Sequence, residues 1–461
     1  MKNKKGLLTY LLLTVTAASL AGCKFFHKDE SVSISRRNYT MHQMRIAEQN
    51  TFKKLNDIHY PSYSSPDKSD MDENWMDSYV SFVDETYRAI INSSNSHNLS
   101  YSSVGLYSLL NNLYGAASRE DLKDDLDALL GLDALNRSSF YRSIMKANSY
   151  ANEYSTTQLK NAAFFNNSYQ YNQDFVDILT QHYCEAYQLN FAYEANKIVE
   201  WVNKAVNADN FIDTNFLEIS KDSELYLFST LYFKNMWAYK YLSSDTSEGN
   251  FYLNDGSVSQ RIFMKHSYMI ESYYDYGSYI SFKDYFRDEN AYSDNASITY
   301  LIPKRLEDNI YDLTKDVNIF KEDESKLVKD ESEYPNYFTV NLKTPKFKIQ
   351  SDVDFKKSLS SLGFADAFNP DFDSFKNAFN DEQLNEYNIY ISVMKQRNQI
   401  EFNEDGSIVT SVSMAGLSKA ESAAFIESKT LDIDLNQPFI YIIRDCNDIP
   451  IFVGRVDNPI R

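Results

Sequence analysis

The stretch that decides the fold reads QIEFNEDGSIVTSVS from residue 399 to residue 413 and leads on toward the end of the chain. Residues 390–402 are rich in β-branched and aromatic side chains, which predicts a strand. Gly406 lets the backbone bend freely, and residues 407–413 then resume as an uncharged segment that can also form a strand. A polar, alanine-rich loop follows. Residues 439–443 after it are almost wholly apolar, as expected of a buried strand.

Shorter pieces of this stretch, in their order and spacing, resemble the C-terminal part of a serpin. Glu404-Asp405-Gly406-Ser407 resembles the hinge at the base of the family's reactive loop. Residues 344–349 and 362–368 resemble further serpin segments, and the likeness runs in order from about residue 71 to residue 461. The pieces that resemble the closing signature of the family are Pro438-Phe439, Arg444-Asp445, Phe452-Val453-Gly454-Arg455-Val456 and Asn458-Pro459.

The resemblance implies an α+β serpin fold with three β-sheets, about eight or nine helices and an exposed reactive-centre loop. The serpin domain would span residues 70–461, with the reactive loop at about 404–430. Composition is consistent with this prediction, because 43% of the 461 residues are hydrophobic, while glycine (12) and proline (9) are scarce. Such a chain can bury a large core and does not read as disordered. We expect a monomer.

The first 22 residues have the pattern of a secretory signal, with lysines at positions 2, 4 and 5 and an apolar run over 7–20. The sequence LAGC at 20–23 resembles a bacterial lipobox, which implies cleavage before Cys23 and a lipid on its thiol. The mature protein is then expected to be secreted and lipid-anchored to the bacterial cell membrane, facing outward. An ordinary signal with an incidental cysteine is the alternative. Residues 23–69 are polar and predict a tether.

Charge and cysteine content narrow the choice of partners. The formal net charge of −19 disfavours binding to nucleic acid, so no nucleic-acid partner is expected. If Cys23 carries a lipid, Cys184 and Cys446 remain. A disulfide between them is possible outside the cell, but two separate core cysteines are favoured, because the serpin resemblance assigns them to different regions of the fold.

The sequence has none of the common short motifs of enzymes or metal proteins. It lacks Gly-x-Gly-x-x-Gly, Gly-x-Ser-x-Gly, Cys-x-x-Cys and His-Glu-x-x-His, and its six histidines are scattered. We therefore expect no catalytic residues, no metal and no cofactor. The chain is predicted not to be an enzyme.

The serpin resemblance implies that the protein inhibits proteases as a suicide substrate. A serine protease, or alternatively a cysteine protease, would attack the reactive loop and form an acyl-enzyme, and the cut loop would insert into the central sheet. Small or β-branched uncharged side chains at alternate hinge positions would face inward. A non-inhibitory serpin-fold surface protein, acting as a binding module or a decoy substrate, is the alternative. The hinge residues predicted in this way are Glu404, Gly406, Ser407, Val409, Ser411 and Ser413.

The position of the attacked bond stays open between two neighbours. The usual family spacing from Gly406 leads to Ala420–Glu421, which would suit an elastase- or subtilisin-like protease. The stretch from Gly406 to Pro438 is longer than expected, so the bond could shift. Lys419–Ala420 would suit a trypsin-like protease, because its lysine can meet an acidic pocket.

Three further residues are assigned by resemblance to the region where the sheet opens. Lys346 and Glu404 occupy positions that pair at the top of the main sheet in serpins, and Trp237 would pack in the same region. Gln396 stands where the family often has histidine, so proton-dependent opening at that position is in doubt. Ordinary packing at the end of a sheet is the alternative for these residues.

Overall fold

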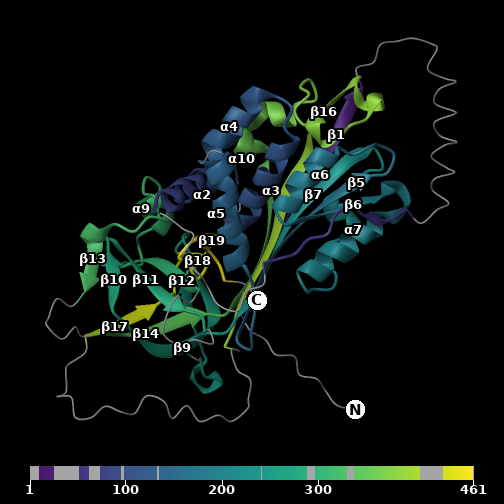
Figure 1. Cartoon of the computed structure of the whole chain (residues 1–461). Helices are drawn as coiled ribbons and strands as arrows, with labels where there is room; N and C mark the ends of the chain where they lie inside the picture. Colours follow the sequence, from purple (N-terminus) through teal and green to yellow (C-terminus); the bar gives the residue numbers. More distant parts are fainter. Residues whose placement is uncertain are drawn as a thin grey trace, which may run out of the picture.

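The computed structural model of the chain (Figure 1) describes residues 10–24, 51–61, 73–94, 98–131, 134–239, 241–287, 296–329, 337–404 and 429–459. These residues form three β-sheets and nine α-helices. The predicted α+β architecture, with three sheets and about eight or nine helices, is confirmed.

The largest sheet, called the central sheet below, has eight strands. Its neighbouring strands are antiparallel except for β5 and β6, which run parallel. From one edge to the other the strands are β15 (Phe347–Asp354), β16 (Tyr387–Phe402), β1 (Tyr10–Lys24), β7 (Ser223–Asn235), β5 (Ser155–Asn166), β6 (Cys184–Leu189) and β2 (Lys53–Lys54), while β4 (Ser149–Ala151) pairs with β5.

Two smaller sheets complete the β structure. The apolar run predicted to be a core strand is β18, whose residues are all buried. The seven-stranded sheet has the order β13 (Leu327–Lys329), β10 (Ser272–Asp275), β11 (Tyr279–Tyr285), β12 (Ser297–Pro303), β18 (Phe439–Arg444), β19 (Pro450–Val456) and β3 (Leu99–Tyr101). The four-stranded sheet has the order β17 (Thr430–Asp434), β14 (Phe338–Pro345), β9 (Val258–Ile270) and β8 (Ser247–Tyr252).

Helices cover both faces of the central sheet (Figure 1). The helix α3 belongs to the main apolar core on one face, while α7 packs on the other face over a second, smaller apolar cluster. The helices are α2 (Glu73–Ser93), α3 (Ser103–Ala116), α4 (Glu120–Leu130), α5 (Ala134–Ala147), α6 (Gln173–Gln181), α7 (Phe191–Ala205), α8 (Thr214–Leu217), α9 (Ile310–Thr314) and α10 (Phe355–Ser361).

The amino-terminal segment lies inside the fold of the full-length chain, whereas the sequence predicts that residues 1–22 lie outside it. Tyr10–Lys24 forms β1, which lies between β7 and β16 and is drawn in purple beside β16 in Figure 1. The physical reason is that an uncharged run of leucine, threonine, valine and alanine suits a buried strand as well as a signal. Cleavage before Cys23, which would remove most of β1, stays a prediction.

Part of the predicted tether also belongs to the body. Residues 51–61 lie along the edge of the central sheet, where β2 pairs with β6. The Leu55 amide donates to the Ala186 carbonyl at 2.8 Å, and the Asn56 side-chain amide accepts from the Ala186 amide at 2.8 Å. Residues 51–61 therefore belong to the fold, because they satisfy the backbone groups of an edge strand, and the tether over residues 23–69 otherwise stays a prediction.

The two internal cysteines lie apart from one another. Cys184 on β6 and Cys446 after β18 are both buried, and no disulfide joins them. The prediction of two separate core cysteines is confirmed.

Candidate functional site

The most distinctive feature of the central sheet is a slot, one strand wide, between β7 and β16. Since β1 is antiparallel to both strands, β7 and β16 run parallel to each other. The backbone of β1 pairs with β7 from Tyr10–Asn235 to Ala21–Ser223, and with β16 from Leu11–Glu401 to Lys24–Tyr387. A single extended segment therefore satisfies the facing backbone edges of both strands along the slot.

One wall of the slot carries buried polar side chains. Gln396 and Asn398 on β16 are both fully buried. The Gln396 side-chain nitrogen donates to Thr16 Oγ1 at 2.5 Å and to the Ser102 carbonyl at 3.1 Å, while its oxygen accepts from the Ser102 amide at 2.8 Å. Thr14 Oγ1 donates to Asn398 Oδ1 at 2.5 Å. The slot therefore offers hydrogen bonds to small hydroxyl side chains on an inserted strand.

Space on this side of the slot is limited by α3. Ser102 caps the helix by accepting a hydrogen bond from the Gly105 amide. A Cβ atom placed on Gly105 would lie 2.6 Å from Thr16 Oγ1 and 3.3 Å from the Gln396 side-chain nitrogen. The first turn of α3 approaches the strand so closely that only a small side chain fits on each partner.

The opposite face of the slot is apolar. Leu13, Val15 and Ala17 of β1 share a cluster with Ile198 and Val202 of α7. From Leu13 to Ala17, side chains therefore alternate between a polar, sterically narrow face toward α3 and an apolar face toward α7. An inserted strand needs small or hydroxyl residues at one set of alternate positions and apolar residues at the other.

The end of β16 that precedes the predicted reactive loop is held by an ion pair. Glu404 is 8% exposed, and its carboxylate pairs with Lys346 and accepts from Thr246 Oγ1 at 2.8 Å. Burial alone would raise the pKa of Glu404, but hydrogen bonds from Lys346, its own backbone and Thr246 together lower the pKa below its usual range. The charged form of Glu404 is therefore stabilised at this end of the sheet.

Trp237 lies beside the ion pair of Lys346 and Glu404. Its indole nitrogen donates to the Asn403 carbonyl at 3.2 Å. Its ring stacks on Phe286 with centroids 5.0 Å apart and lies 6.0 Å from the ring of Phe402. The indole thus fixes the residues at the end of β16, just before the predicted reactive loop.

The residues predicted for the sheet-opening region therefore fall in two places. Trp237 and Lys346 lie with Glu404 at the end of β16, whereas Gln396 lies six residues further into the strand, beside α3. Six residues of extended chain span roughly 20 Å, so Gln396 belongs to the middle of the slot. Their roles in opening the sheet stay predictions.

Most of the predicted loop residues lie outside the described residues. This holds for the hinge positions after Glu404 and for both candidate bonds, and the structure describes Cys23 as the penultimate residue of β1 by its backbone. The positions outside the described residues are Gly406, Ser407, Val409, Ser411, Ser413, Lys419, Ala420 and Glu421.

Apart from Gln396, the polar residues that line the slot were not identified from the sequence. Asn398 lies two residues after Gln396 and therefore points to the same face of β16, a spacing that could have identified it. Gly105 and Ser102 lie nearly 300 positions away in the sequence, and only the packing of α3 against the sheet brings them to Gln396. The signal pattern of residues 1–22 assigns Thr14 and Thr16 to a segment outside the fold.

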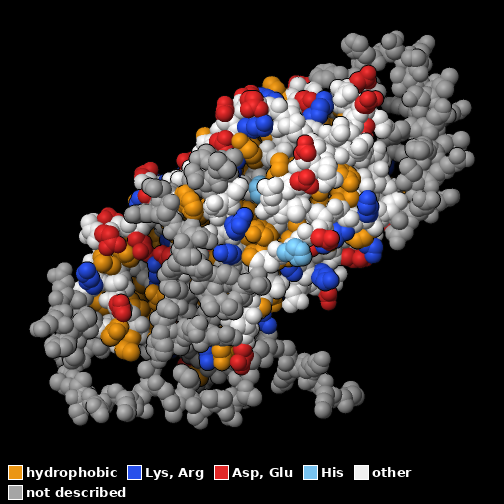
Figure 2. All heavy atoms as spheres, in the orientation of Figure 1, with side chains coloured by type: hydrophobic (Ala, Val, Ile, Leu, Met, Phe, Trp, Pro, Cys, Tyr) orange, Lys and Arg blue, Asp and Glu red, His pale blue; other side chains and the backbone are white. Residues whose placement is uncertain are grey.

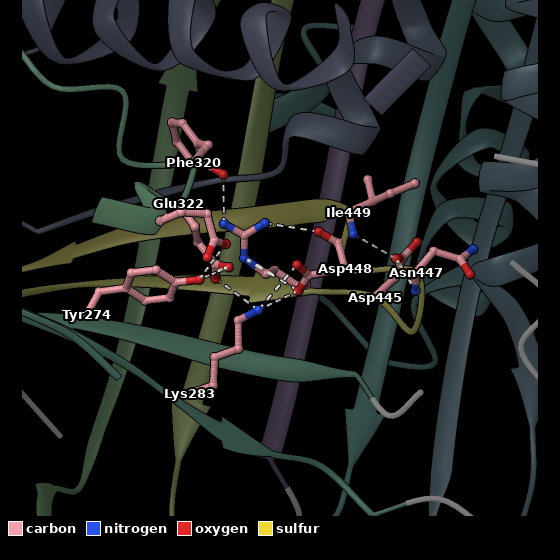
Figure 3. A network of polar contacts seen from close by, with 10 residues as sticks. Tyr274, Lys283, Phe320, Glu322, Asp445, Asn447, Asp448 and Ile449 are labelled. Carbon is pink, nitrogen blue, oxygen red and sulfur yellow. Dashed lines mark hydrogen bonds and ion pairs between the residues drawn. The ribbon is translucent and has the colours of Figure 1, made fainter. Parts of the chain in front are cut away.

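A second polar network holds the hairpin between β18 and β19 (Figure 3). Arg444 is 3% exposed and donates to the carbonyls of Asp448 and Phe320, both at 2.9 Å. Lys283 contacts Glu322 and Asp448, each at 3.0 Å. These groups pair with one another, so we assign this network to structure and not to a binding site.

The described part of the chain has two further properties that bear on function. It contains no group of three or more His, Cys, Asp or Glu side chains arranged to hold a metal ion. In the same residues, no helix combines the length and apolar character needed to cross a membrane.

On the face seen in Figure 2, acidic and basic side chains are interspersed.

Comparison with known families identifies one match over most of the chain. The family model "Serpin (serine protease inhibitor)" matches residues 77–459. The chain is 27% identical to Serpin B10 of Sorex araneus over 338 residues, which cover 69% of this chain and 77% of that protein. It is also 27% identical to the superinfection exclusion protein of Vaccinia virus (strain Western Reserve) over 277 residues, covering 59% of this chain and 67% of that protein.

Solved structures show the same fold. The thermophilic serpin tengpin in its native state superposes with a TM-score of 0.65 at 20% identity, covering 88% of this chain and 100% of that chain. The native stressed conformation of AtSerpin1 from Arabidopsis gives a TM-score of 0.65 at 18% identity, covering 84% of this chain and 100% of that chain.

Proposed function

Because the chain belongs to the serpin family of serine protease inhibitors, we propose that its mature form traps a target protease as a suicide substrate. Family membership supports protease inhibition in general, and a serpin acts as an inhibitor and not as an enzyme. In the proposed mechanism the nucleophile of the protease attacks the carbonyl of the loop bond, forms an acyl-enzyme and releases the new amino terminus. The cut loop then enters the central sheet as an additional strand before the acyl-enzyme is hydrolysed.

The observation that carries this proposal is the slot between β7 and β16. It holds one uncharged strand that is antiparallel to both of its neighbours. The reactive loop follows β16 directly, so a loop that turned back into the sheet would run antiparallel to β16 and β7, as β1 does. The same hydrogen-bonding edges, the hydroxyl-binding Gln396 and Asn398, and the apolar cover from α7 would then serve the loop.

The energy scale of insertion is sufficient for a trap. A strand of about ten residues adds roughly ten backbone hydrogen bonds at ~1 kcal/mol net each. Side chains buried with it add ~25 cal/mol for each Å² of apolar surface. Strand addition to a sheet is a known mode of recognition, and insertion of a loop releases stored strain.

We propose Ala420–Glu421 as the attacked bond, with Lys419–Ala420 as the neighbouring candidate. The proposed target is a serine protease of the elastase or subtilisin type for the first bond and of the trypsin type for the second. We further propose that cleavage before Cys23 and lipidation of its thiol place the mature inhibitor on the outer side of a bacterial membrane. The LAGC sequence at 20–23 supports this anchoring.

The test of the mechanism uses the mature protein and a panel of serine and cysteine proteases. We expect a complex that survives SDS, with the protease attached between residues 417 and 423 in a peptide map. Ser411→Arg would bring an unpaired charge into the sheet, which costs several kcal/mol even after relaxation. This variant should be cut as efficiently as wild type but form at least about tenfold less complex, because about 1.4 kcal/mol is already a factor of ten.

Ser428→Arg is the matched control, because it makes the same change in the part of the loop after the attacked bond. It should form as much complex as wild type. Equal complex formation by Ser411→Arg and Ser428→Arg would contradict insertion of the hinge.

A non-inhibitory serpin-fold binding protein is the second candidate function, and the filled slot in the full-length chain favours it. A loop cannot enter a sheet whose slot already holds β1. Thermal melting of the mature protein before and after cleavage of the loop separates the two functions. A large rise in melting temperature after cleavage supports insertion, whereas an unchanged melting temperature supports the binding protein.

A further inference from the structure

We propose that the slot between β7 and β16 is a strand-binding site whose ligand in the full-length chain is the chain's own segment 10–24, and that this occupancy keeps the inhibitor inactive until the segment leaves. The part of this proposal that concerns inhibition rests on the proposed function. The binding of segment 10–24 in the slot rests only on contacts between described residues.

The first argument is that β1 is bound as an integral strand. The eight consecutive side chains from Leu13 to Leu20 are each at most 4% exposed. The backbone pairs with a neighbour on each side over nearly the whole strand. A segment that merely lay on the surface would bury one edge and one face at most.

The second argument is that the contacts are specific in residue type. Thr14 and Thr16 hydrogen-bond Asn398 and Gln396, and Ser19 Oγ donates to Ser223 Oγ at 3.1 Å. The close approach of Gly105 leaves no room for a larger side chain at Thr16. At the positions of Thr14 and Thr16 the site therefore selects small hydroxyl residues on an uncharged extended segment, whereas Ser19 lies on the other set of alternate positions.

The third argument is that the hinge of the reactive loop has the same pattern in the printed sequence. Residues 14–20 read TVTAASL, and residues 411–417 read SVSMAGL. Both have a hydroxyl residue, valine and a hydroxyl residue, and both have alanine and leucine at matching positions. The pairing register adds to this likeness. A chain that turned back through residues 403–406 would bring Ser411 and Ser413 opposite Asn398 and Gln396, where Thr14 and Thr16 lie.

These arguments make the two segments competitors for one site. The slot is one strand wide, so it holds the amino-terminal segment or the cut loop and not both. Loss of the segment, by cleavage before Cys23 or by displacement, would open the slot. The full-length chain is then an inactive precursor, and removal of its first 22 residues is the activating step.

The test uses the full-length chain carrying Cys23→Ser, which keeps the segment attached, and adds Thr16→Arg or the matched Thr16→Ser. Arginine cannot fit beside Gly105 and would carry an unpaired charge, so it should expel β1, whereas serine keeps the hydroxyl. We expect the Thr16→Arg chain to form at least about tenfold more SDS-stable protease complex than the Thr16→Ser chain. Its melting temperature should rise when the loop is cut, and that of the Thr16→Ser chain should stay constant.

A second experiment has one readout, the melting temperature, that does not depend on any protease, and it also covers a Thr16→Arg chain that fails to fold. A synthetic peptide with the sequence of residues 10–22, flanked by lysines for solubility, is added to the mature protein. It should raise the melting temperature and abolish complex formation, and the same peptide with Thr16→Arg should do neither. If the mature protein forms no complex with any protease, the proposed inhibition fails, but the peptide's effect on melting still decides the inference. Equal complex formation by the Thr16→Ser and Thr16→Arg chains, or a peptide without effect on melting, would overturn it.

Discussion

The carboxyl group of Asp445 is buried in the turn between β18 and β19. Burial raises its pKa from 3.8 to about 6, although the amides of Ile449 and Asn447 and the side chain of Asn148 donate hydrogen bonds that favour the charged form. The nearby Asp448 carboxylate raises the pKa further. Figure 3 shows the turn and these backbone partners. In the folded protein Asp445 therefore keeps its proton to a higher pH than it does in the unfolded chain.

This shift predicts how stability depends on pH. Between about pH 4 and pH 6 the unfolded chain has lost this proton and the folded protein still holds it, so the contribution of Asp445 to stability falls as pH rises. Two pKa units correspond to about 3 kcal/mol. In urea unfolding, Asp445→Asn should gain up to about 3 kcal/mol relative to wild type between pH 4 and pH 7. The contributions of the other carboxyl groups to the pH dependence are the same in both proteins, so they cancel in this difference.

The matched control is Asp448→Asn, which removes a carboxylate from the same turn at a side chain that is 49% exposed. A difference between Asp445→Asn and wild type that stayed constant from pH 4 to pH 7 would refute the shift.

Single residues with a strong sequence context could be placed before the structure was known. The segments around Trp237, Lys346 and Glu404 each resemble a serpin motif, and the structure brings these three residues to one end of the sheet. The resemblance groups Gln396 with these three residues, although Gln396 lies in the middle of the slot. A motif identifies a strand but does not measure how far along the strand a residue lies from another motif.

Among the secondary-structure elements, β1 is one that the sequence could not assign. An apolar, uncharged run has the same composition in a signal and in a buried strand. Only the presence of the slot between β7 and β16 decides that this run forms a strand. The helices and strands from residue 73 onward carry apolar stripes that repeat at helical or strand spacing and are predictable from them. The spacing of apolar residues predicts the type of a single element, whereas the position of β1 depends on two other strands, β7 and β16.

The contact between β1 and α3 predicts a coupling that can be measured in the full-length Cys23→Ser chain. Gly105→Ala places a methyl group 2.6 Å from Thr16 Oγ1 and should destabilise this chain by about 1–3 kcal/mol. Thr16→Ala removes that oxygen, so the double variant should lose less than the sum of the single variants, by about 1 kcal/mol. Urea unfolding of the four proteins measures this coupling.

Ser19→Ala provides the control for this cycle. Its hydroxyl bonds Ser223 and not the first turn of α3, so its effect should add to that of Gly105→Ala. Simple additivity for Thr16→Ala as well would mean that β1 does not lie against α3 in solution.

For the whole molecule, the likeness of many short segments in a fixed order made the fold predictable. The order of the segments, and not any single one, carries the prediction, and the three sheets and nine helices of the described residues agree with it. The boundary of the domain was less predictable. Residues 51–61 pair with the edge of the central sheet, and Leu55 and Tyr60 pack against the main apolar core, although the surrounding stretch is polar.

The amino-terminal segment has two competing environments at the scale of the whole molecule, the membrane and the sheet. Its apolar run over residues 7–20 is shorter than the roughly 20 residues that a membrane-spanning helix needs. The central sheet buries the side chains of the segment and forms hydrogen bonds to its backbone. A lipid environment cannot provide these hydrogen bonds to an isolated strand. Stable attachment of the protein to a membrane should therefore depend on the lipid of Cys23 and not on the segment itself.

This dependence predicts where the wild type and Cys23→Ser are found after expression in a bacterium. Wild type should be in the lipid fraction, and its mass should show that residues 1–22 are absent and that a lipid is present. Cys23→Ser should be in the soluble fraction with residues 1–22 retained, because the uncut segment can fold into the slot. Fractionation followed by mass spectrometry measures both properties. Wild type in the soluble fraction without a lipid would contradict the anchor, and Cys23→Ser in the lipid fraction would mean that the attachment to the membrane lies elsewhere in the chain.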